Sequence, residues 1–215
     1  MSKLIKRNEI PLVMDALEKM HPEAACALDF RTHFQLLVAV MLSAQTTDVS
    51  VNKVTPVLFE KYPTAEAMSE ADTLDVQEII RTIGLYKNKA KNVVALSKML
   101  VSEYGGKVPG DYSELVKLPG VGRKTANVVL AEGFGEARIA VDTHVFRVSN
   151  RIGLTEGKDP VDVEEQLMKR LPKDQWTRAH HLIIFHGRKV CHARKPDCEG
   201  CDIKDICLYN KRGGK

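Results

Sequence analysis

The fold is decided by one stretch, Leu118-Pro119-Gly120-Val121-Gly122-Arg123-Lys124-Thr125-Ala126. It joins a short helical pattern before it to a longer helical pattern after it. Pro119 cannot continue the first helix, because its nitrogen carries no hydrogen to donate. Gly120 and Gly122 permit positive φ and a close approach of backbone to a neighbour. The stretch therefore predicts two helices joined by a tight turn, a helix hairpin over 111–132.

The glycine turn also predicts a binding site for an anion. Successive backbone N–H groups at such a turn, followed by the N-terminus of a helix, point toward one place. Arg123 and Lys124 add positive charge beside it. A DNA phosphate fits such a site without any contact to a base. An ordinary turn between two core helices is the alternative interpretation of the same residues.

The rest of the chain has the pattern of helices, and no stretch alternates with period two over a useful length. Segment 33–45 is the most apolar and predicts a central, buried helix. An all-α fold is therefore expected. The remaining helices are expected over 11–20, 48–62, 64–70, 74–83, 87–104, 159–170 and 174–185, with another beginning near Thr143.

Composition and charge narrow the class of protein. The chain has 215 residues, 44% of them hydrophobic and 28% charged, which is typical of one large or two small globular domains. The longest apolar run, Leu36 to Leu42, is far shorter than the roughly 20 residues that span a bilayer. Near the N-terminus, charged residues occur before any hydrophobic segment of the kind found in a signal peptide. We therefore expect a cytoplasmic protein without a membrane partner. The net charge of +4 permits a nucleic-acid partner.

Four of the five cysteines lie close together near the end of the sequence, with the spacing C-x6-C-x2-C-x5-C. In a chain without a secretion signal this clustering favours a metal centre over disulfides. Zinc and an iron–sulfur cluster can both use four cysteines. Arg194 and Lys195 lie between the first two cysteines and predict a phosphate clamp, although a solvated loop is the usual explanation of such charges. The cysteines are Cys191, Cys198, Cys201 and Cys207.

Two further residues could carry chemistry. Lys124 lies at the start of the second hairpin helix, where the positive end of the helix dipole favours a neutral amine. A neutral amine can attack a sugar carbon and form a Schiff base. Asp142 precedes Thr143-His144 and is expected to cap a helix. Its carboxylate could also stabilise a developing sugar cation.

Together these motifs resemble the endonuclease III family of helix-hairpin-helix DNA glycosylases. The hairpin, Val-Asp-Thr-His and the cysteine array occur in the order that this family has, and the resemblance extends over essentially the whole chain. It implies two helical domains that flank a DNA-binding groove. One would be a six-helix barrel over 26–136 that contains the hairpin, and the other an iron–sulfur domain over 1–25 and 137–215.

The resemblance also implies a function. The chain would be a monomeric DNA glycosylase and abasic-site lyase acting on duplex DNA with damaged pyrimidines or abasic sites. Lys124 would be the nucleophile, Asp142 its partner, and the four cysteines would hold a [4Fe–4S] cluster. Gln45 and Leu85, in Leu-Ser-Ala-Gln-Thr-Thr-Asp and Gly-Leu-Tyr-Lys-Asn-Lys-Ala, would enter the duplex after base extrusion. The other residues expected against DNA are Leu118, Gly120, Gly122, Arg123, His144, Arg147, Arg194 and Lys195.

Three other functions share some of these features. An adenine-specific mismatch glycosylase has the hairpin and the cysteine pattern but normally lacks the hairpin lysine, and the same is expected of a thymine- or uracil-mismatch glycosylase. A non-catalytic helix-hairpin-helix protein would bind DNA through the phosphate site alone. Lys124 argues against the two mismatch glycosylases, and the simultaneous presence of Lys124 and Asp142 argues against a non-catalytic DNA-binding protein.

Overall fold

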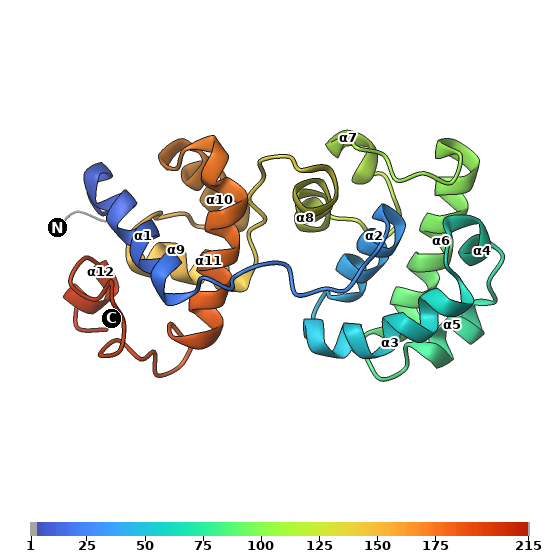
Figure 1. Ribbon diagram of the computed structural model, residues 1–215, viewed down its shortest axis with the longest axis horizontal. Coiled ribbons are helices and arrows are strands. Elements are labelled where there is room, and N and C mark those ends of the chain that lie inside the picture. The colour runs from blue at the N-terminus through green and yellow to red at the C-terminus, as the bar shows by residue number, and fades with distance from the viewer. Residues whose placement is uncertain (1–3, 215) are drawn as a thin grey trace. The chain divides into compact units, whose positions relative to one another are not determined.

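The computed structural model describes residues 4–214 of the chain. In that range every regular element is a helix, twelve of them α and two of them short 3-10 helices, η1 (Arg7–Glu9) and η2 (Lys173–Gln175). The all-α prediction is confirmed. The chain forms two compact units, unit 1 from Met1–Cys26 and Ala137–Lys215, and unit 2 from Ala27–Glu136. Because unit 1 is built from both ends of the sequence, the polypeptide passes between the units twice (Figure 1).

Unit 2 is built around its first helix. Eight of the ten residues of this helix are buried, and it packs against α3, α6 and α8 (Figure 1). The prediction of a central buried helix is confirmed, but the helix ends at Leu42 and not at residue 45. The N–H of Ala44 donates to the carbonyl oxygen of Met41 at 3.3 Å, three residues back instead of four, and Gln45 then has a φ of 53°. The helices of unit 2 are α2 (His33–Leu42), α3 (Asp48–Lys61), α4 (Ala65–Ser69), α5 (Thr73–Ile79), α6 (Tyr86–Tyr104), α7 (Tyr112–Leu115) and α8 (Arg123–Phe134).

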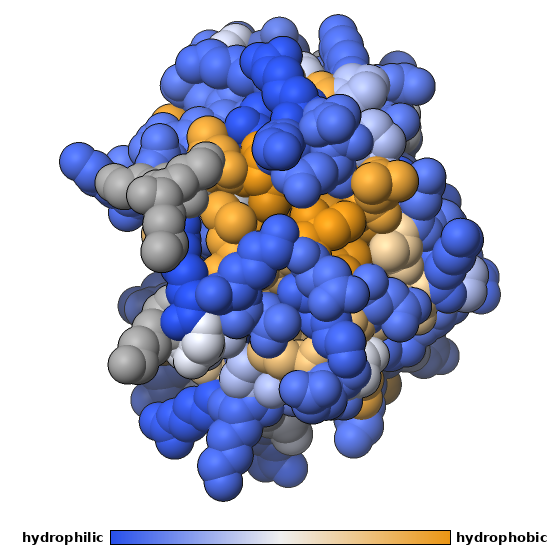
Figure 2. Space-filling model, turned by 90° about the vertical axis from the view of Figure 1, so that its left-hand side faces the viewer, coloured by the Kyte–Doolittle hydropathy of each residue, from blue (hydrophilic) through white to orange (hydrophobic). Residues whose placement is uncertain are grey.

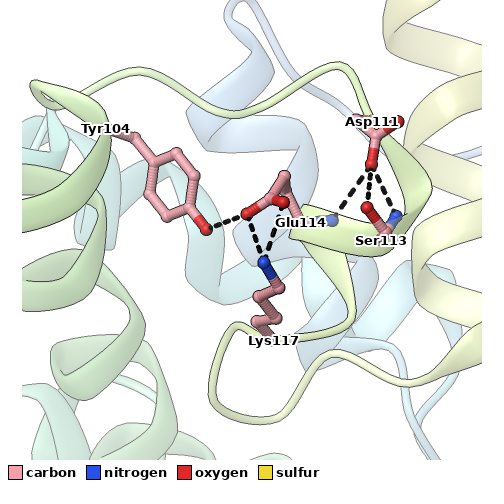
Figure 3. Close-up of polar contacts among 5 residues, drawn as sticks. All are labelled: Tyr104, Asp111, Ser113, Glu114 and Lys117. Atoms are coloured by element: carbon pink, nitrogen blue, oxygen red, sulfur yellow. Dashed lines mark hydrogen bonds and ion pairs between the residues drawn. The ribbon is translucent and has the colours of Figure 1, made fainter.

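Helices α7 and α8 form the expected hairpin. Asp111 caps α7, since its Oδ1 accepts the backbone N–H groups of Ser113 at 2.8 Å and Glu114 at 3.2 Å. The hydroxyl of Tyr104, the last residue of α6, donates to the Glu114 carboxylate at 2.8 Å, and Lys117 pairs with the same carboxylate at 2.8 Å (Figure 3). The first hairpin helix is thereby fixed to the end of α6, and this contact positions the glycine turn that follows.

Unit 1 has a core of its own. Helices α9 and α11 pack against each other, α1 covers α11, and α10 and α12 cover α9. In Figure 2 apolar residues gather in the middle of the face that this unit turns to the viewer, within a rim of hydrophilic residues. Helix α12 was not expected, because four residues are too few to show a period. The helices are α1 (Ile10–Met20), α9 (Thr143–Ile152), α10 (Pro160–Arg170), α11 (Trp176–Lys189) and α12 (Leu208–Lys211).

Between residues 4 and 214, none of these helices combines the length and the apolar character needed to cross a bilayer.

Candidate active site and metal centre

The two glycines of the hairpin turn have different roles. Gly120 has a φ of 80°, and a Cβ atom there would lie 2.9 Å from both Asn92 Nδ2 and Met41 Sδ. Only glycine fits this position without strain. Gly122 does not use positive φ and has an extended conformation with a φ of −98°. A Cβ atom on Gly122 would meet nothing within 4 Å, so the space beside it is open.

Gly122 is the N-cap residue of α8, and no side chain caps that helix. The first N–H groups of an α-helix have no partner within the helix, so they need an acceptor from elsewhere. The first turn of α8 also contains no acidic residue, while Arg123 and Lys124 lie in it and are exposed. This end of α8 is therefore positively charged and suited to an anion.

Leu118, which is expected against DNA, has a buried side chain. Its side chain is only 2% exposed and belongs to the apolar core of unit 2. Its carbonyl oxygen accepts the N–H of Val121 at 3.0 Å, which closes the turn. The Leu118 side chain thus anchors the turn from inside, and the expected contact of this residue with DNA, which its backbone would have to make, stays a prediction.

Asp142 caps α9 as the sequence predicts. Its Oδ1 accepts the backbone N–H of Val145 at 2.7 Å, which satisfies one of the partnerless donors at the start of the helix. Lys124 lies in unit 2 and Asp142 in unit 1.

His144 and Arg147 are half-buried and directed toward the protein's own backbone. The Nη2 atom of Arg147 donates to the carbonyl oxygens of Gly187 and Cys191, both at 3.0 Å, and lies 3.2 Å from His144 Nδ1. Burial lowers the pKa of His144; nearby Asp142 opposes this shift, and Arg147 adds to it. These two residues therefore support the segment at the end of α11, whereas the resemblance placed them against DNA.

Arg151, one turn further along α9, is a functional residue that sequence reasoning missed. Its Nη1 donates to the carbonyl oxygen of His192 at 2.6 Å and its Nη2 to that of Ala193 at 3.0 Å. The guanidinium group also lies 4.5 Å from the centre of the Tyr209 ring. Together with Arg147 it holds the segment around the first cysteine of the array. The repeat of arginine at four-residue spacing on one helix was the available signal.

The four cysteines of the array line a single cavity in unit 1. Burial raises the pKa of the Cys201 thiol to about 11 and also raises the pKa values of the Cys198 and Cys207 thiols. A bound metal would offset this cost by stabilising the thiolates. Among the described residues, no three His, Cys, Asp or Glu side chains form a group that could hold a metal ion. These side chains are therefore not grouped closely enough to hold a single ion, but four thiols around one cavity are the donor set of a larger group with four cysteine ligands.

Two buried histidines lie behind Cys201. His186 is 1% exposed; its Nε2 lies 3.6 Å from Cys201 Sγ, and its Nδ1 lies 3.1 Å from His21 Nε2. Burial lowers the pKa of His186 to about 4, with a smaller contribution from His21. Two arrangements are consistent for a neutral His186: Nε2 donates to the sulfur and Nδ1 accepts from His21, or the Cys201 thiol donates to Nε2 and Nδ1 donates to His21. These residues are separated by 165 positions, and no local pattern predicts the contact.

Three residues between 4 and 214 have positive φ without being glycine: Gln45 at 53°, Leu85 at 57° and Lys195 at 51°. For such residues this conformation costs about 1–2 kcal/mol. All three are among the residues that the resemblance assigns to DNA. Gln45 and Leu85 are exposed, and the apolar Leu85 side chain is 55% accessible. Neither the conformation nor the exposure of these side chains stabilises the fold.

The basic residues around the first cysteine, Lys189, Arg194 and Lys195, are only partly available to a ligand. Lys189 forms an ion pair with Glu23, so it already has an acidic partner from the other end of the sequence. Arg194 and Lys195 are exposed in the loop between the first two cysteines. Of the three, they best fit the expected phosphate clamp.

Comparison with known proteins supports one family. The HhH-GPD superfamily of base excision DNA repair proteins matches residues 38–173. Endonuclease III of Rickettsia felis is 51% identical over 197 residues, 92% of each chain, and that of Bacillus subtilis is 47% identical over 213 residues, 99% of this chain and 97% of the relative.

A solved structure agrees with these relatives. A trapped covalent intermediate between endonuclease III and DNA, in an estranged-adenine complex, matches with a TM-score of 0.93 and 46% identity. The match covers 99% of this chain and 100% of that one. The chain therefore belongs to the HhH-GPD superfamily of base excision DNA repair proteins and, within it, is an enzyme of the endonuclease III family.

Proposed function

We propose that this glycosylase and lyase removes oxidised pyrimidines from duplex DNA and cuts the strand on the 3′ side of the resulting abasic site. The observation that carries the proposal is the exposed amine of Lys124 in the first turn of α8, beside a helix N-terminus that no side chain caps. A phosphate bound at that terminus would hold the DNA backbone next to an amine that can act as a nucleophile.

Chemistry on a base inside a duplex requires the nucleotide to leave the stack. In the proposed reaction the amine of Lys124 attacks the sugar C1′, and the glycosidic bond breaks with its electron pair going to the departing base, which takes up a proton. Loss of the amine proton and opening of the sugar ring give an imine between C1′ and the lysine nitrogen. Removal of a proton from C2′ then expels the 3′ phosphate, and water releases the lysine.

Asp142 is proposed to stabilise the positive charge that develops on the sugar. The cap at the start of α9 holds its Oδ1 at 2.7 Å from the Val145 nitrogen, which fixes the direction of the carboxylate. A charge held in place before the reaction needs no reorganisation as the transition state forms. Capping and catalysis are compatible roles for this residue.

Gln45 and Leu85 are proposed to enter the duplex when the base leaves it. A glycine would relieve the backbone strain at either position, so the side chains themselves must be useful. An exposed, strained leucine makes sense as a wedge between bases, where its apolar surface is buried on binding. Strain of this kind is typical of sites that bind a partner.

The metal centre is proposed to be a [4Fe–4S] cluster bound by Cys191, Cys198, Cys201 and Cys207. When bound, such a cluster supplies a redox-active group and a rigid cross-link of the loop that displays Arg194 and Lys195. The proposed reaction requires no electron transfer, so the role proposed for the cluster is structural or redox-sensing.

Reduction with borohydride during incubation with abasic duplex tests the proposal, because it converts the imine into a stable cross-link. The wild-type chain is expected to become covalently attached to DNA, and Lys124→Gln is expected to lose this attachment while still binding the duplex. Lys107→Gln removes an exposed lysine of the same unit and serves as the control. Trapping that survives Lys124→Gln would identify another amine as the nucleophile. Binding of wild-type chain without any trapping or strand cleavage would reduce the protein to a DNA-binding module.

A further inference from the structure

Lys89 is a buried lysine that the proposed chemistry does not use. It lies in the first turn of α6 and is only 5% exposed. Its Nζ donates to Thr46 Oγ1 at 2.7 Å, between residues 43 positions apart in the sequence. Burial lowers the pKa of this amine below its usual range. Burying an amine costs free energy, which hydrogen bonds within the protein must offset. Packing alone therefore does not explain why this position holds a lysine.

The contact of Lys89 joins the two turns that carry the strained residues. Its backbone N–H donates to the carbonyl oxygen of Leu85 at 3.0 Å, which fixes Lys89 to the turn that begins α6. Its side chain reaches the residue directly after Gln45. Thr46 Oγ1 in turn lies 3.4 Å from the carbonyl oxygen of Ala44, and so spans Gln45. One residue thereby contacts both turns.

The two turns also lie directly against each other. A Cβ atom built on Gly84 would be 3.5 Å from the carbonyl oxygen of Gln45 and 3.8 Å from Thr46 Oγ1, which is ordinary van der Waals contact. All these residues belong to unit 2. The bond between Lys89 and Thr46 joins the two turns across this contact, and movement of one turn relative to the other would break it.

We propose that Lys89 is a positioning residue that fixes the turn carrying Gln45 to the turn carrying Leu85, so that both side chains enter the duplex together. The inference rests on the proposed entry of these two side chains. A methionine would fill the same space with no amine to desolvate, and replacing buried charges by apolar groups of similar volume is often neutral or stabilising. The lysine is therefore better explained by the two turns that its hydrogen bond joins than by a contribution to the stability of the fold.

Two variants remove the same bond from opposite sides. Lys89→Met removes the donor and keeps the length of the side chain, and Thr46→Val removes the acceptor and keeps its shape. Lys91→Met, on the exposed side of the same helix, is the matched control. Each variant is titrated against a duplex with a tetrahydrofuran abasic analogue opposite 2-aminopurine and against the undamaged duplex. The first readout is the ratio of the two affinities, and the second is the rise in 2-aminopurine fluorescence as the opposite base unstacks.

Each of the two variants is expected to lower the preference for the abasic duplex by about tenfold, the value of a hydrogen bond to a charged group. Each should also reduce the fluorescence rise, while Lys91→Met behaves as wild type. The double variant should be no worse than the more affected single variant, because one bond is lost in all three. The melting temperature of Lys89→Met should not fall. If it does fall, the affinity ratio and the fluorescence rise of Thr46→Val, which leaves the lysine in place, decide the question.

Gln45→Ala and Leu85→Ala separate failure of this inference from failure of the proposed function. If these two lower the preference while Lys89→Met and Thr46→Val leave it unchanged, the turns are positioned without Lys89 and the inference is wrong. If Gln45→Ala and Leu85→Ala leave the preference unchanged as well, duplex entry is itself wrong and the inference falls with it.

Discussion

Alanine substitutions in the hairpin turn should separate folding from DNA binding, because the two glycines occupy opposite environments. Gly122→Ala adds a methyl group where nothing lies within 4 Å, on an extended backbone that any residue adopts. Alanine lowers the entropy of the unfolded chain, worth about 0.4–1 kcal/mol, but is a poorer N-cap than glycine by a similar amount. The two effects nearly cancel, so the melting temperature should stay within about 2 °C of wild type.

Gly120→Ala should instead destabilise the protein. The φ of 80° costs an alanine about 1–2 kcal/mol. The overlap with Asn92 Nδ2 and Met41 Sδ at 2.9 Å adds about 1–3 kcal/mol. The sum is about 2–5 kcal/mol, which corresponds to a fall in melting temperature of at least about 4 °C.

DNA binding should be weakened by Gly122→Ala, the variant that leaves stability almost unchanged. If a phosphate approaches the open space beside Gly122, an added methyl group crowds it, and an overpacking cost of about 1.4 kcal/mol or more lowers affinity at least about tenfold. Damaged and undamaged duplexes should lose the same factor, because phosphate contacts position the DNA without distinguishing its bases. Fluorescence anisotropy with both duplexes, together with thermal unfolding, measures the two effects separately.

Gly135→Ala is the matched control for these variants. Gly135 ends the same helix α8 at a φ of 69°, with nothing within 4 Å of a Cβ atom. It should lose stability through strain alone and keep its affinity for DNA. Wild-type affinity in a folded Gly122→Ala variant would show that no phosphate lies against the turn. A loss of affinity confined to one lesion would show that the turn distinguishes damaged from undamaged DNA.

Three further predictions concern the metal centre, the cationic loop and the capping carboxylate. Protein purified without oxygen should be brown and hold about four iron atoms per chain; a colourless protein with one zinc ion would replace the cluster by a zinc site. Arg194→Ala and Lys195→Ala should each flatten the dependence of log affinity on log salt by about one unit, with Lys173→Ala as a control, and an unchanged slope would leave the loop as solvated surface. Asp142→Asn should slow base excision by about 10²–10³-fold and slow cleavage of a preformed abasic site less, because Lys124 can attack the aldehyde directly. Normal excision would leave Asp142 as a helix cap only.

The helices of this protein could be predicted from sequence because their signals are local. Apolar periodicity placed α2, α3 and α6, and Asp142 was identified as a cap from its position before Thr143. The errors arise where tertiary structure overrides local preference. Helix α2 stops before its predicted end: the chain leaves the α-helical hydrogen-bond pattern at Ala44, and Gln45, a residue with no preference for positive φ, then adopts it.

The site was only partly predictable, since its supporting contacts join distant parts of the chain. The spacing of Arg147 and Arg151 places both on one side of α9, but it does not indicate that Arg151 binds the carbonyl oxygens of residues 192 and 193. The pairing of His21 with His186 and the bond from Lys89 to Thr46 are equally non-local. Leu118 shows the opposite problem, because membership of a motif suggested a surface contact for a side chain that packing buries.

The residues best suited to act on DNA have features that do not stabilise the fold. Leu85 exposes an apolar side chain on a strained backbone, and Gly122 leaves the start of α8 without a side-chain cap. Lys89 buries an amine where an apolar side chain would serve packing better. Each of these features destabilises the unbound protein. On a duplex, stacking against bases would compensate for Leu85, a bound phosphate for the uncapped start of α8, and the correct spacing of the turns for Lys89. Selection for stability alone would remove all three, so their coexistence in unit 2 points to binding as the state for which this unit is built.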